Sequence, residues 1–128
     1  MKKGTPNEYR QGDVLLIKVD QIPKDAKPRK SNIIVEGEAS GHAHRIVNGT
    51  ILETKNIFNT VNNLVEKKII PESLGKKLQN EHSLMWIKAS IGAKIVHEDH
   101  GTMEIEVSFY IVSRQREGSE EDQRSVMD

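Results

Sequence analysis

Four of the five histidines in this 128-residue chain stand in two close pairs. His42 and His44 are separated by one alanine, and His97 and His100 by two acidic residues. Neutral imidazole is the commonest metal ligand in proteins, and residues at i and i+2 of a β-strand project from the same face. The two pairs therefore predict a divalent-metal site to which all four histidines contribute.

The absence of cysteine narrows the chemistry of such a site. Without thiols the chain can form neither a disulfide nor a thiolate metal centre. The remaining nitrogen and oxygen ligands suit Zn, Fe, Mn or Ni, and the sequence does not distinguish among these metals. Two other interpretations stay open: a buried, hydrogen-bonded histidine network without metal, and unrelated histidines on the surface. We expect the fifth histidine, His82, on the surface.

Charged groups within the second histidine pair and near the C-terminus could act on a substrate. Glu98 and Asp99 are candidates for the general base that activates a bound water, or for orienting a ligand imidazole. Arg114 and Arg116 share one face of a predicted strand, and two guanidinium groups suit a carboxylate or a phosphate. We therefore predict proton transfer by the two acids and binding of a small anionic substrate by the two arginines. The structural alternative for the arginines is a charge ladder on an edge strand.

Gly12 stands at the start of the first predicted strand, within Arg10-Gln11-Gly12-Asp13. A glycine in this position indicates a tight entry turn or a close approach of the backbone to another group. Structure alone can explain it, so we assign it no chemical role.

Short runs of β-branched and other apolar residues, broken by turn signals, cover most of the chain. We interpret Asn48-Gly49 and Ile91-Gly92 as turns between strands, and residues 103–112 as one continuous strand. Both histidine pairs share a strand face with apolar residues, which places them in or at the mouth of a barrel interior. The predicted strands span residues 13–20, 32–36, 44–47, 51–53, 84–89, 93–97 and 103–112.

The hydrophobic period changes between residues 56 and 80, where apolar residues recur at the spacing of one face of an amphipathic helix. These residues are Ile57, Phe58, Val61, Leu64 and Val65. Asn56 is a candidate N-cap, and Pro71 could begin a second, shorter helix. We therefore predict a helical insertion at about 56–80 between two strands of the sheet.

Together these elements predict a mainly β fold: a small antiparallel β-barrel or sandwich, cupin-like in outline, with a helical insertion. A length of 128 residues favours one domain. We place this domain at residues 1–117. The polar residues 118–128 are expected to form a flexible acidic tail.

Charge and hydropathy argue against several classes of protein. Nineteen basic and nineteen acidic residues cancel, so the chain has no electrostatic footprint for nucleic acid or a membrane surface. The lysines of segment 1–30 lack interleaved aromatic residues that could stack on bases. No apolar run reaches the roughly 20 residues of a membrane span, and the first residues do not form a signal peptide. We expect a cytoplasmic protein, in a bacterial cell or an infected host.

Four short elements resemble a family of small, largely uncharacterised proteins from bacteria and their phages. They are Tyr-Arg-Gln-Gly-Asp-Val at 9–14, Gly-His-Ala-His-Arg at 41–45, His-Glu-x-His at 97–100 and Arg-Gln-Arg-Glu at 114–117. The resemblance implies a shared site built from the four paired histidines, but it supplies no activity, because the family's function is not established. The chain is also loosely similar to the cupins, small β-barrels in which an H-x-H pair and a later histidine hold a metal. This second similarity is an analogy of architecture and ligand type.

The sequence thus favours a small cytoplasmic protein that binds a divalent metal through its two histidine pairs. In the catalytic form of this hypothesis, the protein is a metal-dependent enzyme acting on a small anionic substrate. Two rival hypotheses involve no chemistry. One is a phage or host protein-interaction module that contacts its partner through residues 56–80, and the other is a structural subunit of a homo-oligomer.

Overall fold

The computed structural model describes residues 7–36 and 41–114. Within these ranges the chain is mainly β, as predicted, with two short helices between strands. In chain order the elements are β1 (Glu8–Gln11), β2 (Val14–Val19), β3 (Lys27–Pro28), β4 (Ile33–Glu36), β5 (Ala43–Thr54), α1 (Ile57–Glu66), α2 (Glu72–Leu78), β6 (Leu84–His97), β7 (Gly101–Glu104) and β8 (Ser108–Arg114).

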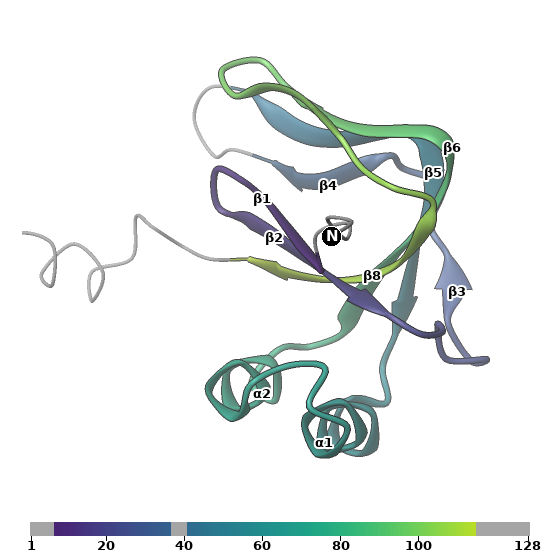
Figure 1. The fold of residues 1–128 in the computed structure, drawn as a ribbon, viewed down its shortest axis with the longest axis vertical. Coiled ribbons are helices and arrows are strands. Elements are labelled where there is room, and N and C mark those ends of the chain that lie inside the picture. Colours follow the sequence, from purple (N-terminus) through teal and green to yellow (C-terminus); the bar gives the residue numbers. More distant parts are fainter. Residues whose placement is uncertain (1–6, 37–40, 115–128) are drawn as a thin grey trace, which may run out of the picture.

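All the strands belong to one open antiparallel sheet, whose main path runs β1-β2-β8-β6-β5-β3. The long strands β5 and β6 pair with each other and carry different neighbours at their two ends. At one end they bind β3 and β8, and at the other end they bind β4 and β7. The sheet therefore folds over itself into two facing halves, which gives a small sandwich open at its edges (Figure 1).

The fold-over occurs where the sequence predicted two turns. Asn48-Gly49 lies inside β5 and Ile91-Gly92 lies inside β6, so the prediction of turns that end strands here was wrong. The β5–β6 register shifts between Val47 and Gly49, and Asn48 has a φ of 59°. The Asn48 side-chain amide donates a hydrogen bond to the Gly92 carbonyl across the pair. Between the pairs Val47–Lys94 and Gly49–Ala89, residues 90–93 of β6 stand opposite Asn48 alone, so β6 carries the bulge that bends the pair without reversing it.

The predicted single strand at 103–112 is in fact two strands, β7 and β8, separated by residues 105–107. The predicted alternation fails at this break, because Val107 is exposed whereas Ile105 is buried. The Tyr110 hydroxyl donates a hydrogen bond to the Glu106 carbonyl at 2.6 Å, within the same segment. The chain must change direction here, since β7 extends one half of the sheet and β8 crosses the other.

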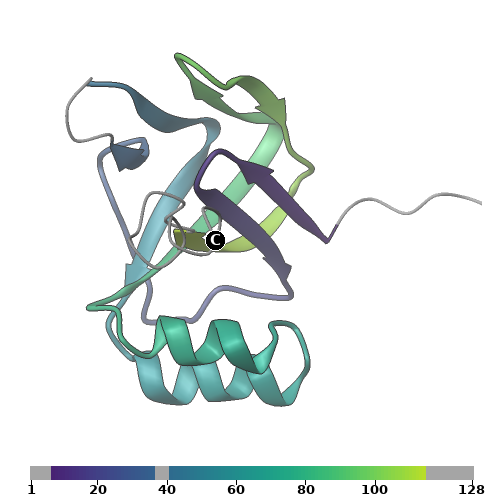
Figure 2. The same ribbon diagram turned by 90° about the vertical axis from the view of Figure 1, so that its left-hand side faces the viewer.

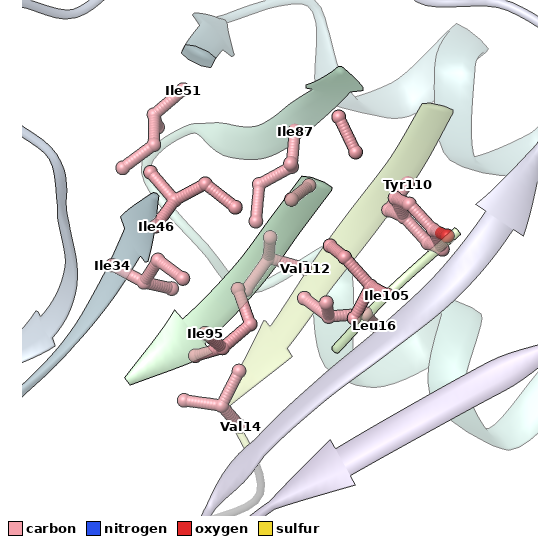
Figure 3. Close-up of a cluster of buried hydrophobic side chains, with 12 residues drawn as sticks. Val14, Leu16, Ile34, Ile46, Ile51, Ile87, Ile95, Ile105, Tyr110 and Val112 are labelled. Carbon is pink, nitrogen blue, oxygen red and sulfur yellow. The ribbon is translucent and has the colours of Figure 1, made fainter. Parts of the chain in front are cut away.

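Two apolar clusters hold the layers together. The first fills the space between the two halves of the sheet, as Figure 3 shows. It contains Val14, Leu16, Ile34, Ile46, Ile51, Ile87, Ala89, Ala93, Ile95, Ile105, Tyr110 and Val112. The second lies between the helices and the outer face of one half, and contains Leu15, Ile17, Val19, Val61, Leu64, Ile70, Leu74, Leu78, Leu84, Trp86 and Ile111.

The predicted helical insertion forms a third layer. Figure 2 shows α1 and α2 side by side beneath the strands. The residues of α1 that face the sheet, Val61 and Leu64, are buried, whereas the Phe58 side chain at its start is 66% exposed. The proposed use of this segment as a partner-binding surface therefore stays a prediction that concerns its outer face.

Some sequence predictions concern residues that the structure does not describe. Arg116, the domain boundary at 117 and the acidic tail at 118–128 lie beyond the described ranges. Among the residues that are described, neither helix has the length and apolar character needed to cross a membrane.

Candidate metal centre

Three chain segments that are distant in sequence meet at one side of the folded sheet. They are the β1–β2 turn at Gly12-Asp13, the start of β5, and the β6–β7 turn at residues 98–100. Figure 1 shows all three on the same side of the molecule as the end of β8. Gln11, the residue before the first of these segments, forms hydrogen bonds with His44 in β5 and with the carbonyl of Gly101 directly after the β6–β7 turn. The side chains of these segments form the candidate site.

His44, His97 and His100 gather within this site. Each offers a ligand atom, and these atoms all lie within 4.8 Å of one another. Two nitrogens bound to one zinc ion at about 2.1 Å each can be no more than about 4.2 Å apart. The three rings therefore need only a small inward movement to share an ion. His44 is buried and His100 is exposed, so the cluster opens to solvent on one side.

The His44 imidazole is fixed by Gln11. The Gln11 side-chain amide donates to the Ile95 and Gly101 carbonyls at 3.1 and 3.2 Å, which turns its oxygen toward His44 Nδ1 at 2.8 Å. An amide oxygen only accepts, so His44 Nδ1 carries the proton. The lone pair of this ring therefore resides on Nε2. A metal-binding histidine characteristically donates its other ring N–H in this way.

The His44 Nε2 atom faces a carboxylate. It lies 3.2 Å from Asp13 Oδ1, although the His44 side chain is only 4% exposed. Burial lowers the pKa of His44 below 6.5, and the neighbouring His97 lowers it further, which outweighs the opposite effect of Asp13. At neutral pH two electron-pair donors thus point at each other, an arrangement that a shared cation would stabilise.

His97 is held by the turn that follows it. Its Nδ1 accepts hydrogen bonds from the backbone N–H groups of Asp99 and His100, at 3.0 and 3.2 Å. A ring nitrogen that accepts carries no proton, so the proton of neutral His97 is on Nε2. The side chain thus closes the β6–β7 turn and fixes its own tautomer.

His42 lies beside the three-histidine group and not in it. It precedes β5, and its ring centroid is 6.0 Å from that of His97. Its Nδ1 lies 2.6 Å from Asp99 Oδ2, so the carboxylate orients the His42 ring. Of the first predicted pair, the structure therefore brings only His44 into the cluster.

The two predicted acid–base residues have different surroundings. Glu98 Oε1 accepts from the Ala43 backbone N–H at 2.9 Å, and its Oε2 accepts from Arg45 at 3.1 Å. These contacts, led by the Ala43 N–H, lower the pKa of Glu98 to about 2. An acid of that strength is a poor general base at neutral pH. Glu98 instead ties the start of β5 to the β6–β7 turn.

This tie gives a testable pH dependence. We expect the Glu98 carboxyl to titrate near pH 2 in the folded protein, against 4.5 for an ordinary glutamate. Since the folded-state pKa is the lower one, the tie is fully present above about pH 4.5 and is lost as the pH falls toward 2. Carbon NMR of the carboxyl measures the midpoint. Arg45→Gln should raise it only in part, because the Ala43 N–H remains; a midpoint near 4.5 in the unaltered protein would contradict the contact.

Arg114 reaches the same site from the end of β8. Its Nε lies 3.8 Å from Asp13 Oδ2, so Asp13 stands between Arg114 and His44. The edge-strand interpretation of the arginines was wrong for Arg114, because β8 lies between β2 and β6. Its predicted companion, Arg116, is not among the described residues.

Sequence reasoning missed Gln11 and Asp13 as site residues. The available signal was Gly12 between them, whose predicted close approach is present. Gly12 has a φ of +59°, and a Cβ at this position would stand 2.7 Å from His100 Nε2. The turn therefore places its neighbours against the histidines. The sequence could not show that Gly12 approaches His100, because 87 residues lie between them in the chain.

The comparison with known proteins finds a matching family, but it gives no activity for that family. The family described as Domain of unknown function (DUF8820) matches the chain over residues 10–115. This agrees with the resemblance to an uncharacterised family, whereas the bacterial or phage origin and the cupin analogy stay predictions. Searches of curated proteins and of solved structures found no match.

Proposed function

The chain belongs to the family described as Domain of unknown function (DUF8820), and from its site we propose that it binds one divalent metal ion. The proposed ligands are His44, His97 and His100, with Asp13 as an oxygen ligand. Three imidazoles and a carboxylate form a set suited to Zn, Fe, Mn or Ni.

The observation that supports this most strongly is the state of His44. Its Nδ1 proton is committed to Gln11, and its Nε2 lone pair lies 3.2 Å from Asp13 Oδ1 in a buried setting. A histidine network built only for packing would place a donor opposite the carboxylate, because buried polar groups are normally paired donor to acceptor. Here the two acceptors face each other, next to two further imidazoles.

Binding requires an adjustment at His97. Its Nδ1 accepts hydrogen bonds from the backbone N–H groups of Asp99 and His100, so the ring proton is on Nε2. If His97 binds the ion through Nε2, that nitrogen must first lose its proton. We therefore expect the β6–β7 turn to rearrange when the ion binds, so that Nδ1 can become the protonated nitrogen. The amide resonances of these two residues should shift most among those of the turn.

An enzymatic role is a further part of this proposal. A divalent ion at such a site lowers the pKa of a bound water and polarises a substrate oxygen. Of the chain's own groups, His42 and Asp99 are the best placed to move a proton, because Asp99 holds His42 Nδ1 at 2.6 Å and makes Nε2 the basic nitrogen. Glu98 would hold the turn in place.

Metal titration of the purified protein tests the proposal. The chain is stripped with a chelator and titrated with Zn, Fe, Mn and Ni salts by calorimetry, with elemental analysis of the product. We expect one ion per chain and, at a hundredfold excess over the dissociation constant, a rise in melting temperature on the order of 10 °C. If none of the four metals binds stoichiometrically, the proposal is overturned.

Gln11 provides a separate test, because it orients a ligand without touching the ion. Gln11→Ala should weaken metal binding about 10- to 100-fold. It should also destabilise the metal-free fold by about 1–3 kcal/mol, since buried carbonyls and the His44 N–H lose their partner. Gln11→Glu keeps an acceptor for His44 but loses the donors to Ile95 and Gly101, so it should retain more affinity than Gln11→Ala. Equal affinities in the two variants would contradict the orienting role.

A further inference from the structure

The register of the sheet places Arg114, at the end of β8, beside the β1–β2 turn. In the antiparallel pair of β2 and β8, Arg114 is opposite Val14, the residue directly after Asp13. Figure 1 shows the β1–β2 turn and the end of β8 on the same side of the molecule. Since β8 lies between β2 and β6, the arginine approaches the proposed ligand Asp13 from a central strand of the sheet.

The Arg114 Nε atom lies near Asp13 but is not bonded to it. This nitrogen has almost no accessible surface and, among the described residues, no hydrogen-bond partner. Asp13 Oδ2 is 3.8 Å away, whereas an N–H···O bond requires about 3.2 Å or less. A buried donor without an acceptor is unfavourable, so a short movement of Oδ2 toward Nε would stabilise the arginine.

The other oxygen of the same carboxylate already has the spacing of a metal ligand. Asp13 Oδ1 is 3.2 Å from His44 Nε2. Two ligand atoms bound at about 2.0–2.1 Å to one tetrahedral ion lie about 3.3 Å apart. An ion can therefore bind both atoms while Oδ1 stays in place. A turn of the carboxylate about Oδ1 then suffices to bring Oδ2 within bonding distance of Arg114.

We propose that Arg114 is a positioning residue of the metal site and acts through Asp13. When an ion binds His44 Nε2 and Asp13 Oδ1, Arg114 Nε donates a charge-assisted hydrogen bond to Oδ2. The carboxylate is thereby held so that it binds the ion through one oxygen only. This inference rests on the proposed function, to which it adds a residue that does not contact the ion.

The choice of metal follows from this one-oxygen binding mode. Zinc typically takes four ligands, which the three imidazoles and Asp13 Oδ1 supply. Manganese suits six ligands, mainly oxygens, and a carboxylate that binds through both oxygens supplies one more of them. Because Arg114 occupies Oδ2, it withholds that second oxygen. We therefore expect Arg114 to favour zinc over manganese.

The charge of Arg114, taken alone, has the opposite effect on metal binding. A fixed positive charge near a divalent cation repels it, so removal of the charge would tighten binding. Removal of a hydrogen bond that orients a ligand weakens metal binding, typically 10- to 100-fold. The sign of the change in zinc affinity therefore separates the positioning role from a purely electrostatic one.

Calorimetry of the whole chain with zinc and with manganese tests the proposal. Arg114→Gln should weaken zinc binding about 10- to 100-fold and lower the ratio of zinc to manganese affinity. Arg114→Lys keeps the charge but lacks Nε, so it should not restore the zinc affinity. Arg29→Gln is the matched control, because Arg29 is 31% exposed against 39% for Arg114 and pairs with Glu53. This control should change neither affinity.

A double-mutant cycle shows whether Arg114 acts through Asp13. Asp13→Ala leaves three imidazoles for zinc and gives the arginine no carboxylate to hold. In this background, Arg114→Gln should not weaken zinc binding further. The Nε–H proton resonance of Arg114 gives a second readout. Zinc should shift it downfield in the unaltered protein and not in Asp13→Ala. Circular dichroism verifies that each variant is folded.

Zinc affinity that is unchanged or higher in Arg114→Gln would overturn the positioning role, as would an equal loss with and without the Asp13 carboxylate. In these cases zinc still binds the unaltered protein, so the proposed function stands. If the unaltered protein binds neither metal, the proposed function fails and this inference fails with it. If Arg114→Gln does not fold, the Nε–H resonance of the unaltered protein decides, and its failure to shift with zinc overturns the inference.

Discussion

His44→Ala is expected to lower metal affinity by more than about 100-fold, so that the purified variant contains no stoichiometric metal. Loss of a group that only orients a ligand costs 10- to 100-fold, and loss of the ligand itself should cost more. His44 is the buried member of the cluster and the one whose lone pair is set by a fixed tautomer. Elemental analysis and zinc calorimetry measure the effect.

Two companion variants make this result specific. His100→Ala removes an exposed ligand and should weaken binding without disturbing the core. His82→Ala removes an exposed histidine outside the cluster and should change nothing. Since His44→Ala also leaves the Gln11 oxygen unpaired, a loss of about 1–3 kcal/mol in stability is expected and is measured separately. Retention of one tightly bound ion in a folded His44→Ala protein would falsify the assignment.

Gly12→Ala should damage both the fold and the site. A non-glycine residue at a φ of +59° costs about 1–2 kcal/mol, because its Cβ crowds the backbone. The new Cβ would also stand 2.7 Å from His100 Nε2, so this ring must move away. We expect a lower unfolding free energy in denaturant and a further loss of metal affinity, on the order of tenfold or more.

Gly41→Ala separates these two effects. Gly41 has a φ of +75°, and in the described part of the chain no atom lies within 4 Å of the Cβ that alanine would add. Both substitutions should therefore cost similar backbone strain, whereas only Gly12→Ala should weaken metal binding. Equal metal affinities in the two variants would mean that the approach of Gly12 to His100 does not matter for the site.

Sequence periodicity predicted the elements whose burial follows a simple repeat. The helical spacing at 57–65 and the short helix after Pro71 are both present, because each buries one apolar stripe against the sheet. Asn48-Gly49 misled because the positive φ that Asn48 adopts occurs in a hairpin turn and also opposite a bulge. The difference lies in Ile91-Gly92 on the facing strand, which local sequence cannot reveal.

The same limit, that local sequence does not reveal contacts across the fold, decided which residues of the candidate site could be predicted. His44, His97 and His100 could be predicted because histidine pairing is visible within a few residues. Gln11 and Asp13 contribute through contacts made across the fold, and their residue types are ordinary in a polar hairpin turn. The surroundings of Glu98 could not be predicted either. Its partner is the backbone N–H of Ala43, and every residue type except proline has a backbone N–H.

The hydrogen bond between Gln11 and Gly101 joins chain positions 90 residues apart, and it is made by the residue that fixes the His44 tautomer. A ribosome must therefore have synthesised β7 before the centre can exist at all. The proposed ion would then differ from the ions of small zinc-nucleated domains, because its complete site forms only with the fold. On this proposal the ion is acquired after folding, so we expect metal scarcity to leave a folded protein without its ion.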